Sequence, residues 1–276
     1  MHLLRRGLWL LLLICGPAYA GVVISVAEIS PVMEQLAQKL SEQIEMPVLI
    51  ALADALPPLS ETDTVILIGD QPVRSWTGNA RAIAVLAERR VVETARAKLS
   101  AAVFREPPLQ RQYDLTRYLF HDAHVALIYS NAVLPWAWPE LNSLEEQGVR
   151  LVRFDPEQSL NYALRDALSG SDVLLGVMDS TVYNPQSIKN ILISAYRQNI
   201  PLIGPGPAFI RAGAIASTYS SLGDTVTVLA DMLSGRRPFA FIYNPYFSVD
   251  FNQQVARSLN MSLPDDPAPV VSAIRR

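Results

Sequence analysis

A repeated alternation of short apolar runs with segments of helical periodicity constrains this chain most strongly. The apolar runs are rich in Val and Ile and lack polar alternation, as in residues 22–26 (VVISV). Such strands are typical of parallel sheets that helices cover on both faces. In the segment after them, Leu36, Leu40 and Ile44 recur at helical spacing, behind a helix start at Ser30-Pro31. The pattern predicts an α/β protein.

The alternation divides into two series of similar length, and these predict two Rossmann-like lobes with parallel sheets and a hinge rather than one long sheet. The predicted strands cover residues 22–26, 48–52, 65–68 and 82–86 in the first series, and 125–129, 151–154, 173–177 and 201–203 in the second. The predicted helices of the second series cover residues 139–147, 156–168 and 185–198. A further helix follows Tyr219 and ends at Gly235, and residues 89–120 are predicted to be helical in parts, with a break at Pro107-Pro108.

We expect the chain to cross between the lobes near His121 and Tyr219. The first predicted lobe is then residues 21–121 plus 220–240, and the second is residues 122–219 plus 241–264. Residues 265–276 read as a loose tail.

Residues 1–20 have the pattern of a secretory signal. Arg5 and Arg6 precede an apolar run over residues 8–14, which is too short to span a bilayer, and an Ala-x-Ala site ends at Ala20. Cys15 is the only cysteine; Ile14 precedes it where lipoprotein signals carry a small residue, so we interpret Cys15 as part of the removed signal. A cysteine-free mature chain suits an oxidising compartment, and we expect the periplasm.

The composition argues against a nucleic-acid partner. The chain has 23 Lys and Arg against 26 Asp and Glu, and it contains no basic block that would neutralise phosphates. Half of the residues are apolar, which is enough for a sizeable core without disulfides.

The second half resembles the bacterial ABC-transporter substrate-binding proteins of type I periplasmic-binding fold, whose members include tryptophan and tyrosine binders. The resemblance extends over residues 122–264. The matching stretches are residues 173–183 (VLLGVMDSTVY), 200–201 and 212–216, Leu222-Gly223, residues 232–235 with Pro238, and residues 249–264 (VDFNQQVARSLNMSLP). It implies a hinged, two-lobed binding protein that delivers a solute to a membrane permease.

Candidate ligand-binding residues follow the carboxyl ends of the predicted strands, where open α/β sheets bind ligands. Asp179, Ser180 and Thr181 match a ligand-facing Asp-Asn-Thr stretch of the resembling family. Asp179 either holds a ligand amine or anchors its own loop. Glu28, Asn131 and Tyr183 are further predicted ligand-binding residues at strand ends. The same reasoning makes candidates of Ser30, Asp70, Glu88, Arg89, Ser130, Asp155, Pro205 and Tyr219, some of which must be bystanders.

Aromatic residues offer a platform for a ligand ring. Trp136 and Trp138 are predicted to lie in the loop after residues 125–129, where they either contact ligand or fill a packing gap. Arg74 and Trp76 are expected to face them from the first lobe, with Arg74 gripping a carboxylate.

The sequence offers no catalytic set. His121 and His124 lack further metal ligands at a recognisable spacing, and no nucleophile elbow or phosphate-binding glycine loop is present. We therefore expect no enzyme activity, no metal and no cofactor. The predicted function is that of a monomeric periplasmic protein that binds a small, possibly amino-acid-like or aromatic, solute and presents it to an ABC-type permease. The alternative is a ligand sensor that signals to a membrane receptor or kinase without transport.

Overall fold

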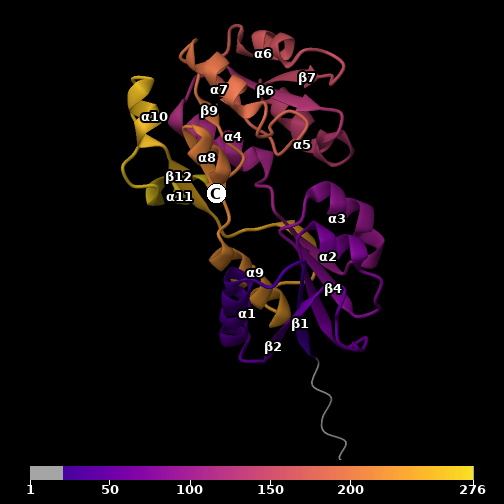
Figure 1. The fold of residues 1–276 in the computed structure, drawn as a ribbon. Coiled ribbons are helices and arrows are strands. Elements are labelled where there is room, and N and C mark those ends of the chain that lie inside the picture. The colour runs from indigo at the N-terminus through magenta and orange to yellow at the C-terminus, as the bar shows by residue number, and fades with distance from the viewer. Residues whose placement is uncertain (1–20, 276) are drawn as a thin grey trace, which may run out of the picture.

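The computed structural model describes residues 21–275, which form two α/β lobes (Figure 1). Each lobe is built on a six-stranded sheet, so the predicted pair of Rossmann-like lobes is confirmed. The predicted signal segment, with Cys15, lies outside the described residues. Within residues 21–275, no helix combines the length and the apolarity that a membrane span requires.

The first lobe has a fully parallel sheet in the order β11-β5-β4-β3-β1-β2. Its central strands are buried on both faces, which explains their unbroken apolar sequence. The strands are β1 (Val22–Val26), β2 (Val48–Leu52), β3 (Thr64–Ile68), β4 (Arg81–Val85), β5 (Ala101–Phe104) and β11 (Phe241–Tyr243).

Helices cover both faces of this sheet. On one face α1 packs against α9, and on the other α2 packs against α3. Helix α1 begins as predicted: Ser30 accepts a hydrogen bond from the Met33 N–H, and Pro31 occupies the first turn. The helices are α1 (Pro31–Ile44), α2 (Asp70–Ser75), α3 (Arg89–Ala95) and α9 (Leu222–Leu233), and a 3-10 turn, η1 (Arg96–Lys98), precedes β5.

The second lobe has a sheet in the order β12-β10-β9-β8-β6-β7, in which only the edge strand β12 is antiparallel. Its strands are β6 (Val125–Ser130), β7 (Arg150–Phe154), β8 (Val173–Leu175), β9 (Leu202–Ile203), β10 (Ala216–Tyr219) and β12 (Ser248–Phe251). Its helices are α4 (Leu109–Leu119), α5 (Leu134–Glu146), α6 (Leu160–Leu168), α7 (Ile188–Tyr196), α8 (Pro207–Ala212), α10 (Gln253–Ser258) and α11 (Ala268–Ile274).

The chain passes between the lobes at residues 105–108, 220–221 and 244–247, which differs from the predicted boundaries. Helix α4 was assigned to the first lobe, but its apolar face joins the core of the second lobe. Its buried Gln112 donates to the Gly204 carbonyl at 2.8 Å and accepts from the Thr218 N–H at 3.0 Å. The first crossing therefore precedes α4, and none lies at His121.

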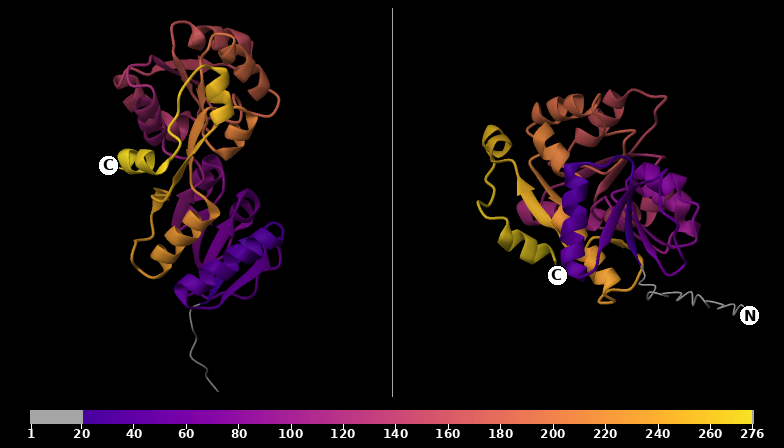
Figure 2. Two further views of the ribbon diagram at one scale, coloured as in Figure 1. Left: turned by 90° about the vertical axis from the view of Figure 1, so that its left-hand side faces the viewer. Right: turned by 60° about the horizontal axis from the view of Figure 1, so that its bottom comes forward.

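Three further segments differ from the prediction. Residues 101–104 form strand β5 in a segment that was expected to be helical. Residues 241–243 pair with β5 and so extend the first sheet, not the second lobe. Residues 265–276 are not a loose tail over their described length, because α11 packs on α4 with Val270 fully buried. Figure 2 shows this C-terminal helix beside the junction of the lobes.

Candidate functional site

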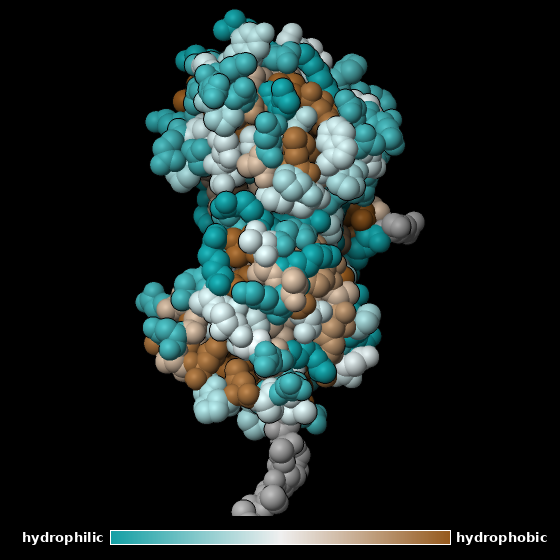
Figure 3. Space-filling model, turned by 90° about the vertical axis from the view of Figure 1, so that its right-hand side faces the viewer, coloured by the Kyte–Doolittle hydropathy of each residue, from teal (hydrophilic) through white to brown (hydrophobic). Residues whose placement is uncertain are grey.

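A cleft of about 220 Å³ lies between the lobes, at the carboxyl ends of strands from both sheets. On the face that carries α3 and α5, hydrophilic residues gather at the junction (Figure 3). The first lobe and its crossing segment line the cleft with Glu88, Arg89, Arg90, Arg105 and Glu106. The second lobe contributes Ala132, Val133, Trp136, Met178, Asp179, Ser180, Tyr183 and Phe209. One wall is charged and the other is largely apolar.

Arg89 connects the charged wall to the second lobe. It begins α3, just after β4, and its guanidinium lies 4.3 Å above the centre of the Phe104 ring. Its Nη1 donates to Oε1 of Glu140 on α5 at 3.3 Å and also contacts the Tyr243 hydroxyl. Burial raises the pKa of Tyr243 far above its usual value, and the nearby Glu140 charge adds to this shift. The Tyr243 hydroxyl is therefore a donor, and it contacts Glu140 as well.

Glu106 lies on the first crossing segment, directly behind Arg89. Its Oε1 accepts a hydrogen bond from the Arg89 backbone N–H at 3.0 Å and so caps the start of α3. Its Oε2 is buried and has no hydrogen-bond partner among residues 21–275. Burial raises the pKa of this carboxyl, against smaller lowerings by hydrogen bonds from the backbone and by the nearby charges of Arg105 and Arg89. Glu106 is thus a carboxyl group with one occupied oxygen and one free oxygen.

Asp179 lies in the cleft wall, but its carboxylate is occupied by the protein. It follows β8 and is 2% exposed. Its Oδ2 accepts from the Ser130 N–H at 2.6 Å, and its Oδ1 accepts from the Ser130 hydroxyl at 3.1 Å and from the Thr181 N–H at 3.0 Å. These contacts tie the end of β6 to the loop after β8, which favours the loop-anchor interpretation. Ser180, next to it, also lines the cleft.

Trp136 and Trp138 lie on helix α5, so the prediction that they lie in a loop is wrong. Pro135 fits the first turn of this helix, and Ala137 between the tryptophans is buried. Residues two apart on a helix point to nearly opposite sides. Trp136 accordingly lines the cleft, whereas Trp138 is 47% exposed and is not among the lining residues.

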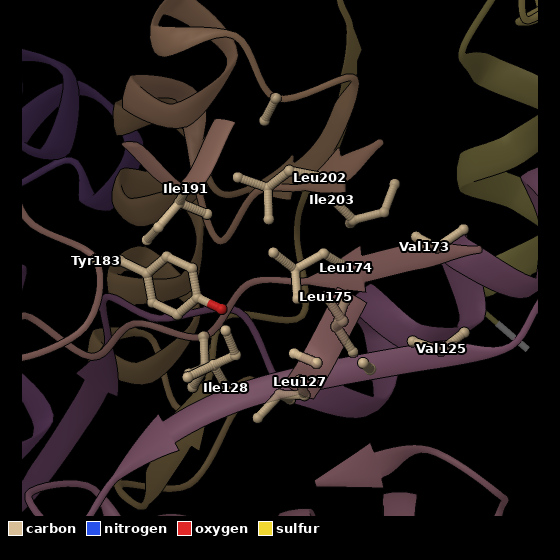
Figure 4. Close-up of a cluster of buried hydrophobic side chains, with 14 of the residues drawn as sticks. Val125, Leu127, Ile128, Val173, Leu174, Leu175, Tyr183, Ile191, Leu202 and Ile203 are labelled. Atoms are coloured by element: carbon tan, nitrogen blue, oxygen red, sulfur yellow. The ribbon is translucent and has the colours of Figure 1, made fainter. Parts of the chain in front are cut away.

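Tyr183 borders the cleft but belongs mainly to the core of the second lobe. Figure 4 shows its ring among apolar side chains, with the hydroxyl pointing toward Ile128. The ring packs edge-on against Phe209 at 6.3 Å between centroids. Burial raises the pKa of its hydroxyl far above the usual value. Its contribution to the cleft is therefore apolar.

Besides Trp138, four predicted site residues do not line the cleft. Arg74 is exposed and faces Asp70 at 3.9 Å on its own helix. Trp76 is buried in the core of the first lobe, where its ring lies against Gly78. Glu28 and Asn131 lie at exposed positions after β1 and β6. The short helix α2 holds Arg74 and Trp76 close to the first sheet, so they do not face Trp136.

Several cleft residues were not among the predicted site residues. Glu88 and Arg89 follow β4 and are candidates by their position at a strand end, but they are not among the nine predicted ligand-binding residues. Arg105 and Glu106 follow β5, and that strand was not predicted. Phe209 lies on the short helix α8, with no sequence signal to mark it.

His121 and His124 do not line the cleft. The Nδ1 of His124 lies 2.9 Å from Oδ2 of Asp172, at an exposed position where β6 begins. No group of three or more metal-ligating side chains occurs within residues 21–275.

No protein-family model matches the chain, and no curated protein matches it. Several solved structures, in contrast, are similar to this chain. The ligand-free, open structure of a substrate-binding protein with adhesive properties from Clostridium difficile has a TM-score of 0.65 at 12% identity, covering 90% of this chain and 97% of that one.

Two further structures have the same fold. A domain in complex with L-Trp from Streptococcus pneumonia has a TM-score of 0.56 at 13% identity, covering 90% of this chain and 97% of that one. A conserved domain protein from Vibrio cholerae has a TM-score of 0.55 at 15% identity, covering 89% and 96%. The chain therefore has the two-lobed type I fold of periplasmic substrate-binding proteins, the fold that the sequence resemblance implied.

Proposed function

We propose that the protein is a periplasmic solute-binding protein that captures a small solute between its lobes and presents it to an ABC-type permease. The observation that carries this proposal is a cleft lined by side chains from both lobes. A solute that contacts both walls stabilises the closed arrangement, because it binds that arrangement better than the open one. The similar structure that holds L-Trp supports a small molecule as the occupant.

In this proposal residues 1–20 are a signal that directs export to the periplasm and is cleaved after Ala20. The mature protein is proposed to be a monomer. The proposed partner, an ABC-type permease, binds the closed arrangement of the two lobes. The charged wall then orients the polar groups of the solute, while Trp136, Val133 and Met178 cover its apolar part.

The test uses the full chain, expressed with its N-terminal segment and purified from the periplasmic fraction. Mass spectrometry of the intact protein should show that it begins at Gly21, and mass spectrometry of released small molecules should identify a bound solute. Adding that solute back to stripped protein should reduce the radius of gyration in small-angle scattering. A solute that binds without changing the radius would show a rigid binding module and reject closure.

A further inference from the structure

Three buried polar side-chain atoms of the cleft lining have no hydrogen-bond partner among residues 21–275: Arg89 Nε, Tyr183 Oη and Glu106 Oε2. Of these only Glu106 Oε2 is a carboxylate oxygen. The other oxygen of this carboxylate, Oε1, accepts from the Arg89 N–H. A buried acceptor without a donor is unfavourable, so such groups in folded proteins are usually paired. A ligand that brings a donor to this oxygen gains that pairing.

Two of the three arginines that line the cleft with Glu106 face other carboxylates. The Arg89 guanidinium faces Glu140 at 3.3 Å and Glu93 at 3.5 Å. Arg105 faces Glu88 at 3.7 Å. Each of these arginines therefore has a carboxylate of its own, and Glu106 has no ion-pair partner within the described range.

The space beside Glu106 suits a small group. Glu106 lines both the main cleft and an adjoining recess of about 30 Å³, and Arg89, Val133, Trp136 and Met178 also line both. A recess of this size holds roughly one or two groups as large as a water molecule. An ammonium group has that size, and the main cleft remains for the body of the molecule.

The charge of the combined site also favours a cation. Four carboxylates and three guanidinium groups line the cleft and the recess, the carboxylates being Glu88, Glu106, Glu140 and Asp179, and the guanidinium groups Arg89, Arg90 and Arg105. The positive charge of one ammonium group makes the numbers of positive and negative charges equal. The Trp136 ring lines both spaces, and aromatic faces attract cations at short range.

We propose that Glu106 is the specificity-determining residue of the cleft and that it binds the ammonium group of a small amine, whose apolar body lies against Trp136. This inference rests on the proposed function. Because Glu106 lines both the cleft and the recess, the ammonium group occupies the recess in this proposal and the apolar body lies in the wider cleft.

Isothermal calorimetry with phenethylamine and its neutral analogue phenethyl alcohol tests the inference. Wild-type protein should bind the amine at least about tenfold more tightly than the alcohol, and Glu106→Gln should remove about that factor for the amine only. The glutamine retains an acceptor for the Arg89 N–H, and circular dichroism checks that the variant folds. Glu34→Gln is the control for the loss of one carboxylate charge, since Glu34 lies at an exposed position on α1 and does not line the cleft or the recess; it should keep the wild-type affinity for the amine.

Equal affinity of wild-type protein for the amine and the alcohol, or an unchanged amine affinity in Glu106→Gln, would overturn the inference. So would a released natural solute without a basic nitrogen. If such a solute still closes the lobes, the proposed function stands and only the assignment of Glu106 fails. If neither this solute nor phenethylamine binds, both fail.

Discussion

Replacing Asp179 by alanine distinguishes the two roles that the sequence allows for this residue. In the structure the carboxylate accepts three hydrogen bonds, two from Ser130 and one from the Thr181 N–H. The substitution leaves these donors unpaired in a wall where Ser130 is itself 1% exposed. A large loss of stability is expected, because the carboxylate joins the end of β6 to the loop after β8.

The magnitude follows from the number and kind of these bonds. A hydrogen bond to an ionised group contributes about 1.5–3 kcal/mol, and bonds that share one carboxylate do not add fully. We therefore expect a loss of about 3–5 kcal/mol, in line with the removal of one partner from a buried charged pair. At about 2–4 °C per kcal/mol for a protein of this size, the melting temperature should fall by roughly 10 °C.

Differential scanning calorimetry measures this change, with Asp155→Ala as the control. Asp155 also follows a strand of the second sheet, but among residues 21–275 its carboxylate accepts a single, exposed hydrogen bond, from the Glu157 N–H at 3.0 Å. The control should melt within about 2–4 °C of wild type, as for a loss near 1 kcal/mol. If Asp179→Ala melts like the control and instead abolishes solute binding, the carboxylate binds the solute and the anchoring argument is refuted.

Three other outcomes are expected. Glu140→Gln removes the charge that faces Arg89 across the junction, so the solute-free protein should show a larger radius of gyration in small-angle scattering; an unchanged radius would mean that this contact does not hold the lobes together. Val270→Asp places a charge at a fully buried position and should cost about 2–4 kcal/mol in thermal unfolding, whereas Ser272→Asp on the exposed side of α11 should cost little. Because burial raises the pKa of Glu106, the affinity for phenethylamine should decrease as the pH falls through that raised pKa, and calorimetry of Glu106→Gln should lack this step.

The strands of both sheets were predictable where Val, Ile and Leu form unbroken runs. These runs are buried on both faces, so their composition follows directly from their position. Strand β5 was missed because Ala101 and Ala102, although fully buried, are weak strand formers and lie in a helix-rich stretch. Helix α4 was placed in the wrong lobe because an amphipathic pattern shows that a helix has a buried face but not which core it joins.

The same reasons determine how much of the site was predictable. The expectation that ligand-binding residues follow the carboxyl ends of strands identified Asp179, Ser180 and Trp136, all of which line the cleft. It also selected Arg74, since a strand end does not specify which way the next turn directs its side chains. Glu106 was missed as a consequence of the missed β5, and its unpaired oxygen has no signature in sequence.

Glu106 lies on the crossing over residues 105–108, directly before Pro107 and Pro108. Proline fixes one backbone angle, so this connection bends less freely than the crossing at 220–221, which contains no proline. A molecule held by Glu106 therefore lies beside one of the three crossings. If the lobes rotate about these crossings, its shape limits how far they can close.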